Sequence, residues 1–369
     1  MKKVISLLLC MVIAFMMTAC GGSGEAIDLA EEDPETKGMS TDAGTSIEVT
    51  SAKESLNPLT GKKDLANDAV GMRPYAISVN NISSSLPQKG ILNADITYEI
   101  EAEGGITRMM CMFADSREIE MIGSVRSLRD QFIEALYPLN PIIVHIGTSV
   151  IADRVLNENS FRTIDANEVR SALFFDKVKN QSYDTEHCYF TSATLIEKGI
   201  EILGIKKTTS SSIPAFNFAK EGEYAEPGTG TASSVYFEFS KGSYGYDGDL
   251  RYDATAKKYL KFQHGKEQID AQADNKQLSY DNVIVLVADI VPAKGVDPKD
   301  GLVTVNYQNG GTGYYLCQGR YEEIKWTKGD FSSNFIFTKA DGTDLVVNPG
   351  QTYFAVFDND NMDTFKIAG

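Results

Sequence analysis

The chain has 369 residues, and at about 150 residues per domain this length predicts two domains and disfavours one alone. Hydrophobic residues make up 42% of the chain and aromatic residues 10%, which is enough to build cores and excludes disorder of the whole chain. The formal net charge of −16 disfavours a nucleic-acid partner, because phosphate binding depends on Lys and Arg.

Residues 1–19 are typical of a cleaved signal peptide, with Lys2 and Lys3 before an uncharged apolar stretch. That stretch ends near Thr18 and is shorter than the roughly 20 residues that span a bilayer. The segment at its end, Met17-Thr18-Ala19-Cys20-Gly21, resembles a bacterial lipobox, with Met17 in place of the usual Leu. This resemblance implies lipidation of Cys20 and anchoring at the outer, extracytoplasmic face of the bacterial cytoplasmic membrane. The alternatives are a secreted protein or an uncleaved anchor with an incidental Cys.

Residues 20–56 are predicted to form a flexible acidic tether. They are rich in Gly, Ser, Thr, Asp and Glu and contain no aromatic residue, so they cannot bury a core. Folded structure is expected from residue 57, and the Ser/Thr-rich segment 208–212 divides it into parts 57–212 and 213–369.

The first part, 57–212, reads as a mixed α/β domain. Strands are predicted at 75–79 and 142–146, and a helix at 127–136 begins with a possible capping box, Ser127 to Asp130. The clearest local signal is a hairpin, in which alternating residues 95–103 turn at Gly104-Gly105 into residues 106–113. If those two glycines form the whole loop, Glu101 lies opposite Arg108 and Glu99 opposite Met110.

The second part, 213–369, is dominated by short strands separated by turn signals. We therefore predict an α+β protein in which a mainly antiparallel, all-β domain follows the mixed domain. The expected strands are 235–239, 259–263, 283–288, 302–307, 313–317, 321–326, 334–338 and 353–357.

Several motifs in chain order resemble the YerB-like family of bacterial lipoproteins. They include Asn57-Pro58-Leu59-Thr60-Gly61, Arg73-Pro74-Tyr75 with Asn80-Asn81, Ala94-Asp95-Ile96-Thr97-Tyr98-Glu99, Glu103-Gly104-Gly105-Ile106-Thr107-Arg108, Gly123 to Arg129, Val144-His145-Ile146-Gly147, Phe174-Phe175-Asp176 and Tyr321 to Trp326. Two positions depart from the family pattern, Ser124 in place of Pro and Cys188 in place of Asn. The resemblance implies a two-domain extracytoplasmic lipoprotein and supplies no activity, since the family is one of unknown function.

We expect the first part to bind a polar or anionic ligand, or a cell-wall or envelope protein partner. Arg126 and Arg129 flank a predicted helix start, and guanidinium groups bind carboxylate or phosphate bidentately. In this hypothesis Arg108 and Glu101 form a supporting pair. The polar pocket walls are His145, Asp176 and His187. The competing interpretation is that both arginines only pair with carboxylates such as Glu99 or Glu103.

The alternative function is a cell-wall glycan or peptide hydrolase, using His145 or His187 with Asp95 or Glu99. The sequence has no G-x-S-x-G, H-E-x-x-H or phosphate-binding loop, and neither a metal nor another cofactor is expected. Beyond Cys10 and Cys20, three cysteines remain, which are free buried thiols or include one long-range disulfide. These three are Cys111, Cys188 and Cys317.

Overall fold

The computed structural model describes residues 51–369 except 211 and 242–245, and the predictions for residues 1–50 lie outside this range. Strand β1, Lys53–Ser55, falls within the range 20–56 that was expected to be tether. It pairs with β2, Leu65–Ala66, and Lys53 forms an ion pair with Glu118. The tether was predicted to end at residue 56, but regular structure begins at Lys53. The sequence of β1 has no apolar pattern, and the strand is ordered by backbone pairing with β2.

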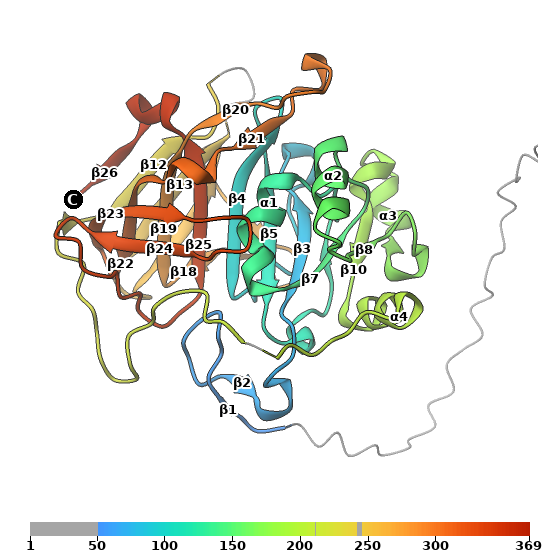
Figure 1. Ribbon diagram of the computed structural model, residues 1–369, viewed down its shortest axis with the longest axis horizontal. Helices are drawn as coiled ribbons and strands as arrows, with labels where there is room; N and C mark the ends of the chain where they lie inside the picture. Colours follow the sequence, from blue (N-terminus) through green and yellow to red (C-terminus); the bar gives the residue numbers. More distant parts are fainter. Residues whose placement is uncertain (1–50, 211, 242–245) are drawn as a thin grey trace, which may run out of the picture. The chain divides into compact units, whose positions relative to one another are not determined.

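Within the described residues, one 11-stranded sheet runs through both parts of the chain. Figure 1 shows β4, β5, β3 and β7 side by side in it, in agreement with their pairing. The path is β11 (Gly230–Thr231), β23 (Arg320–Lys328), β22 (Gly311–Cys317), β19 (Asn282–Ala288), β25 (Thr352–Asp358), β4 (Ile96–Glu103), β5 (Ile106–Phe113), β3 (Tyr75–Asn80), β7 (Ile142–His145) and β8 (Ile164–Asp165), with β24 (Phe335–Lys339) paired to β23.

The two parts of the chain meet at β25, which lies between β19 and β4 and is parallel to both. Strand β25 is buried on both faces, as expected for a nearly continuous apolar run in parallel pairing. The predicted class, a mixed α/β part followed by a mainly antiparallel β part, is confirmed. The boundary near residue 212 stays a prediction.

One face of the sheet is covered by two short helices, α1 (Asp130–Leu136) and α2 (Val150–Glu158). Alternate strand residues such as Met110 and Phe354 pack into the core on this side. Helix α2 begins after Ser149, whose Oγ accepts a hydrogen bond from the backbone N–H of Ala152, as an N-cap residue does.

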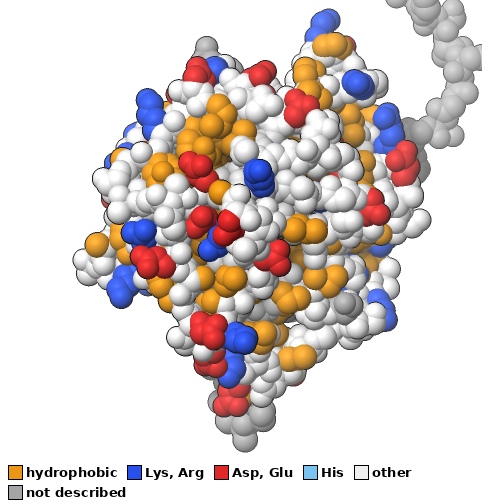
Figure 2. Space-filling view, turned by 60° about the vertical axis from the view of Figure 1, so that its left-hand side comes forward, with side chains coloured by type: hydrophobic (Ala, Val, Ile, Leu, Met, Phe, Trp, Pro, Cys, Tyr) orange, Lys and Arg blue, Asp and Glu red, His pale blue; other side chains and the backbone are white. Residues whose placement is uncertain are grey.

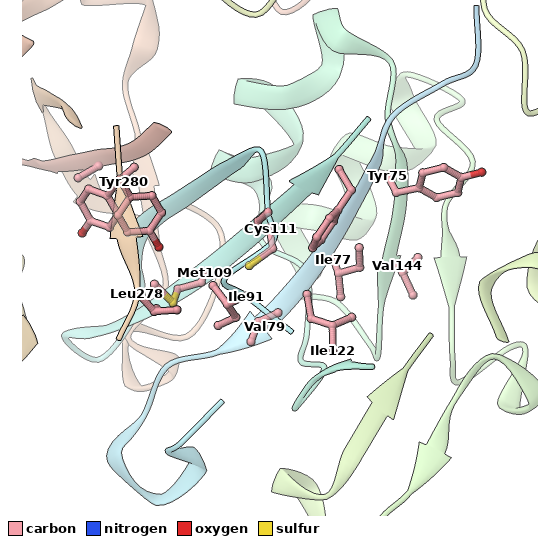
Figure 3. Close-up of a cluster of buried hydrophobic side chains, with 14 of the residues drawn as sticks. Tyr75, Ile77, Val79, Ile91, Met109, Cys111, Ile122, Val144, Leu278 and Tyr280 are labelled. Carbon is pink, nitrogen blue, oxygen red and sulfur yellow. The ribbon is translucent and has the colours of Figure 1, made fainter. Parts of the chain in front are cut away.

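The other face is covered by α4 (Ala193–Leu203) and a second sheet. Figure 3 shows part of this core, where Ile77, Val79, Cys111 and Val144 project from neighbouring strands toward the same side. The second sheet contains β12 (Ser234–Glu238), β13 (Asp247–Asp253), β14 (Lys258–Gln263), β15 (Lys266–Glu267), β18 (Ser279–Tyr280) and β26 (Lys366–Ala368).

The remaining elements form small additions to these layers. They are α3 (Lys177–Asn180), β6 (Ile122–Gly123), β9 (Phe174–Phe175), β10 (Tyr189–Thr191), β16 (Ile269–Asp270), β17 (Lys276–Gln277), β20 (Ile290–Pro292) and β21 (Val303–Val305). The helix predicted at 127–136 begins only at Asp130, so the proposed capping box is wrong. Residues 126–128 are instead held by backbone hydrogen bonds, from Arg126 N–H to Ser78 and from Leu128 N–H to Gly147.

Candidate functional site

The carboxyl ends of several strands meet at one edge of the large sheet. Strands β3, β7 and β8 are parallel, and β4 runs in the same direction because β5 is antiparallel to both β3 and β4. Asn80, Glu103, His145 and Asp165 are the last residues of β3, β4, β7 and β8. In open α/β sheets this edge is where ligands bind, so its polar side chains form the candidate site.

The turn of the β4–β5 hairpin decides which carboxylate reaches Arg108. The register shifts between Glu101 and Glu103, so that Ile100 rather than Glu101 lies opposite Arg108. The predicted Glu101–Arg108 pair and the Glu99–Met110 register are therefore wrong, because a bulge adds one residue to β4. The bulge brings Glu103 to Arg108 instead, with Nη2 of Arg108 donating to Oε1 of Glu103 at 2.9 Å.

Glu103 is shared between two arginines. Its Oε2 accepts a 2.7 Å hydrogen bond from Nε of Arg129, the residue that immediately precedes α1. Burial opposes ionisation of Glu103, but Arg108 and Arg129 outweigh this effect and lower its pKa. The carboxylate is therefore held ionised between two guanidinium groups.

Arg108 has no exposed side-chain surface. Among the described residues, its Nε and Nη1 have no hydrogen-bond partner. Burial lowers the pKa of Arg108 to about 9, and Arg129 and Arg126 add to this effect while Glu103 opposes it. A buried guanidinium with two unused donors needs further acceptors.

Arg126 lies beside this pair and reaches toward residues 186 and 187. Its Nη1 donates to Oε2 of Glu186 at 3.2 Å, while its buried Nε has no partner within the described chain. We call Arg108, Arg126 and Arg129, with Glu103 and Glu186, the arginine cluster. It contains three guanidinium groups and two carboxylates.

His187 borders the arginine cluster and is held by Asn80 and Ser84. Its Nδ1 lies 3.1 Å from Nδ2 of Asn80, and its Nε2 lies 3.3 Å from Oγ of Ser84. The Oδ1 of Asn80 accepts a hydrogen bond from the backbone N–H of Ile82, so the Nδ2 of Asn80 is the atom that faces His187. Because Nδ2 is a donor, Nδ1 of His187 accepts, and the proton of the neutral imidazole is on Nε2. Burial and the nearby Arg126 lower the pKa of His187, which favours the neutral ring.

His145, Asp176 and Glu101 do not join this cluster. The Nδ1 of His145 donates to the carbonyl of Gly147, and its Nε2 accepts from the hydroxyl of Thr163, each at 2.8 Å. Asp176 caps α3 by accepting from the N–H of Lys179. Of the seven predicted ligand-binding residues, Arg108, Arg126, Arg129 and His187 are brought together.

The constellation required by the hydrolase hypothesis is not assembled in the described residues. Asp95 precedes β4, at the opposite end of that strand from Glu103, and accepts hydrogen bonds from Asn57 and from the N–H of Ala114. Glu99 lies in mid-strand and accepts from Asn81, Thr107 and Tyr353. Neither carboxylate shares a hydrogen bond with His145 or His187.

Sequence reasoning missed a buried polar network between the two parts of the chain. Asn81 donates to Glu99, and its own Oδ1 accepts from Gln88 and Gln268. Glu99 in turn lies 3.6 Å from the ammonium group of Lys261. The Asn80-Asn81 motif was the only signal for it, since Gln268 and Lys261 lie more than a hundred residues away in the sequence.

Other predictions concern cysteines, metals and membrane helices. Cys111, Cys188 and Cys317 are free and buried. Over residues 51–369, apart from the undescribed positions, no group of three or more His, Cys, Asp or Glu could hold a metal ion. In the same part of the chain, no helix has the length and apolar character needed to cross a membrane.

The fold and the motifs define a class of two-domain proteins without a described activity. The family described as "Protein of unknown function (DUF3048)" matches with its N-terminal domain over residues 59–206 and with its C-terminal domain over residues 235–354. The chain belongs to this YerB-like family, and the resemblance seen in its motifs is confirmed.

A particular relative is "Putative lipoprotein YerB" of Bacillus subtilis (strain 168). It is 27% identical over 309 residues, which cover 83% of this chain and 87% of the relative. The crystal structure of the YerB protein from Bacillus subtilis matches with a TM-score of 0.72 and 24% identity, covering 85% of this chain and 99% of that chain. This structural likeness shows a shared fold.

Proposed function

We propose that this protein is a lipid-anchored extracytoplasmic protein that binds an anionic ligand, or an anionic group of an envelope partner, at the arginine cluster. The single observation that carries the proposal is Arg108, which is fully buried with two guanidinium nitrogens lacking partners. A structural ion pair would use those donors, whereas a site for an incoming anion keeps them unused.

The charges around Arg108 support the same ligand class. Among the described residues, the carboxylates hydrogen-bonded to the three guanidinium groups are Glu103 and Glu186, so the hydrogen-bonded cluster has one more positive group than negative in a chain of formal net charge −16. Figure 2 shows acidic and basic side chains interspersed on one face of the molecule, without a large basic patch there. The cluster is thus a local positive site, suited to one phosphate or carboxylate group rather than to a polyanion such as nucleic acid.

The location of the protein is part of the proposal. The relative YerB is named as a lipoprotein, and Cys20 of this chain lies in the lipobox-like segment. An anchored protein of this kind meets wall polymers that carry phosphate, and peptides that end in carboxylates. We therefore place the ligand among cell-envelope anions.

Isothermal titration calorimetry of the purified full chain, at low salt, tests the proposal with glycerol 3-phosphate and acetate as probes. The site variant is the double substitution Arg126→Ala and Arg129→Ala. The matched control is Arg162→Ala with Arg320→Ala, which removes two arginines paired to Glu168 and Glu226 elsewhere on the molecule.

We expect one of the two probes to bind the unmodified chain. The site variant should bind it at least about tenfold more weakly, since hydrogen bonds to charged groups contribute about 1.5–3 kcal/mol. The control variant should keep the original affinity. Equal affinities for the site and control variants, with both folded by circular dichroism, would exclude the arginine cluster as the binding site.

A further inference from the structure

A cavity of about 390 Å³ lies at the carboxyl ends of β7 and β8, on the same edge of the large sheet as the arginine cluster. The last residues of these two strands, His145 and Asp165, belong to its lining. None of the residues of the arginine cluster lines it. The volume is within the range of small-molecule sites, and ligands of open α/β sheets bind at this edge.

The walls of the cavity are mostly polar, and their polar side chains have accessible surface. Asp153 and Asn157 of α2 are exposed, as is Ser160 in the turn that follows the helix. Asp165 is half-buried. A ligand in the cavity can therefore reach these groups.

Several charged groups of the lining are already satisfied by the chain itself. The Oε1 of Glu168 accepts a 2.6 Å hydrogen bond from Nη2 of Arg162. The Oδ1 of Asp165 accepts from the backbone N–H groups of Gly147 and Asn167, each at 2.9 Å. Because Glu168 and Arg162 neutralise each other, we do not assign either of them to a ligand.

The groups that remain include both donors and acceptors. Asp153 accepts a hydrogen bond from the hydroxyl of Thr148 through Oδ1. Among the described residues, Oδ2 of Asp153 and Oδ2 of Asp165 accept no hydrogen bond, and the side chains of Asn157 and Ser160 make none. A carboxylate only accepts, whereas an amide and a hydroxyl also donate. A ligand with several hydroxyl groups, each a donor and an acceptor, matches this mixture.

The apolar part of the lining is small and consists of Leu156 and Phe161, which are both half-buried. The ring of Phe161 packs edge-on against Tyr137, with 5.1 Å between the ring centroids, and this contact fixes its position. Such side chains offer contact to C–H groups rather than to a large apolar body. His145 adds no charge, because burial lowers its pKa and favours the neutral ring.

We propose that this cavity binds a sugar that carries no acidic group. The mixture of donors and acceptors matches hydroxyl groups, and the small apolar part matches the C–H groups of a sugar ring. An acidic sugar is disfavoured, because the lining contains three carboxylates and one guanidinium group. This ligand class differs from the anions proposed for the arginine cluster, so the proposal does not rest on that function.

The test uses glucose, galactose and mannose as probes, with the purified full chain, in saturation-transfer difference NMR titrations. We expect at least one of the three sugars to bind saturably. Cyclohexanol, a ring of similar size with a single hydroxyl group, should bind at least about tenfold more weakly, because it lacks the other hydroxyl groups. The uronate of the bound sugar should also bind at least about tenfold more weakly, because the carboxylates of the lining repel it.

Two substitutions at one position of α2 locate the binding. Asn157→Trp fills the cavity from an exposed helix position and should abolish sugar binding. Asn157→Ala removes only the amide and should weaken binding about threefold or more. Arg154→Trp is the matched control, since Arg154 is exposed on the same helix and does not line the cavity, and it should leave the affinity unchanged. Circular dichroism checks that each variant is folded.

Four outcomes would overturn the proposal. Three of them are the absence of saturable binding of all three sugars, binding of cyclohexanol or the uronate as tight as that of the sugar, and unchanged affinity in a folded Asn157→Trp variant. The fourth is loss of sugar binding in the Arg126→Ala, Arg129→Ala variant, which would place the sugar at the arginine cluster. Unchanged sugar binding in that variant is expected whether or not anion binding is lost, so the two proposals fail independently.

Discussion

The carboxylate of Glu99 lies 3.6 Å from the ammonium group of Lys261, and neither side chain has any exposed surface. Glu99 belongs to β4 and Lys261 to β14, so this pair connects the two parts of the chain. Tyr353 adds a 2.7 Å hydrogen bond to Glu99, and Lys261 also donates to the carbonyls of Asp247 and Phe262. The pair is thus hydrogen-bonded on both sides, which a buried ion pair needs to offset the cost of desolvation.

Breaking this pair from one side should be strongly destabilising. Lys261→Met leaves Glu99 buried without its cation, and we expect the free energy of unfolding to fall by about 3–5 kcal/mol. The double variant Glu99→Gln, Lys261→Met should lose less than the sum of the single variants. Urea denaturation of all four proteins gives the coupling free energy. Lys325→Met, at an exposed lysine, is the control, and a loss in Lys261→Met no larger than in this control contradicts the prediction.

The carboxyl group of Asp95 should make stability depend on pH. Burial raises the pKa of Asp95 to about 7, although the N–H of Ala114 opposes the rise. In the unfolded chain the pKa is about 3.9, so between these values the native state binds more protons than the unfolded state. This group should therefore lower stability as pH rises from about 4 to 7, by up to about 1.4 kcal/mol per pH unit, and have no further effect above pH 7.

The Asp95→Asn variant measures that contribution. Its free energy of unfolding, determined by urea denaturation from pH 4 to 8, should fall less steeply with pH than that of the unmodified chain. Loss of an acceptor for Asn57 or Ala114 shifts the whole curve without restoring the slope. Parallel curves for the two proteins would show that Asp95 titrates normally.

The two parts of the chain should unfold in one transition. Trp326 is the only tryptophan, and it lies in β23 with its side chain buried in the core, so its fluorescence reports on the second part. Far-UV circular dichroism reports on all elements. Because β25 pairs with strands from both parts, we expect the two probes to give the same denaturation midpoint. Separated midpoints would indicate independent domains.

Lipidation should depend on Cys20. In the native bacterium, Cys20→Ser should move the protein from the detergent-rich to the aqueous phase in a phase-partition assay, because each buried CH₂ of an acyl chain contributes about 0.8 kcal/mol of membrane binding. Mass spectrometry of the N-terminal peptide checks for the acyl groups. Cys10→Ser changes a cysteine within the predicted signal peptide and should have no effect. An unmodified Cys20 in the native protein contradicts the anchor.

The predictable part of the fold came from local patterns. The strands expected at 283–288 and 353–357 are β19 and β25, because continuous apolar runs bounded by turns are legible in the sequence. Strand β13 was missed, because its sequence begins Asp247-Gly248-Asp249 and lacks that pattern. The register of the β4–β5 hairpin depends on a bulge, and neither the composition nor the alternation of the residues in β4 predicts that bulge.

The site was predictable only in its residue types. Arg126 and Arg129 were identified from their positions beside a predicted helix start, but the contact of Arg129 with Glu103 was fixed by the bulge and by a helix that starts three residues later than expected. Gln263 and Gln268 gave no signal, because their partner Asn81 lies in another part of the sequence. Contacts between distant segments are set by the assembled sheets, which local periodicity does not encode.

The central position of β25 also constrains the order of events during biosynthesis. Until residues 352–358 have left the ribosome, β4 has no neighbour on one side, and a nascent chain stalled before Thr352 presents an open backbone edge. The two halves of the large sheet are therefore joined only after β25 has been synthesised. Pairing between segments so far apart in the sequence is slow. A nascent chain that lacks β25 therefore leaves one edge of β4 and one edge of β19 unpaired until that segment is synthesised.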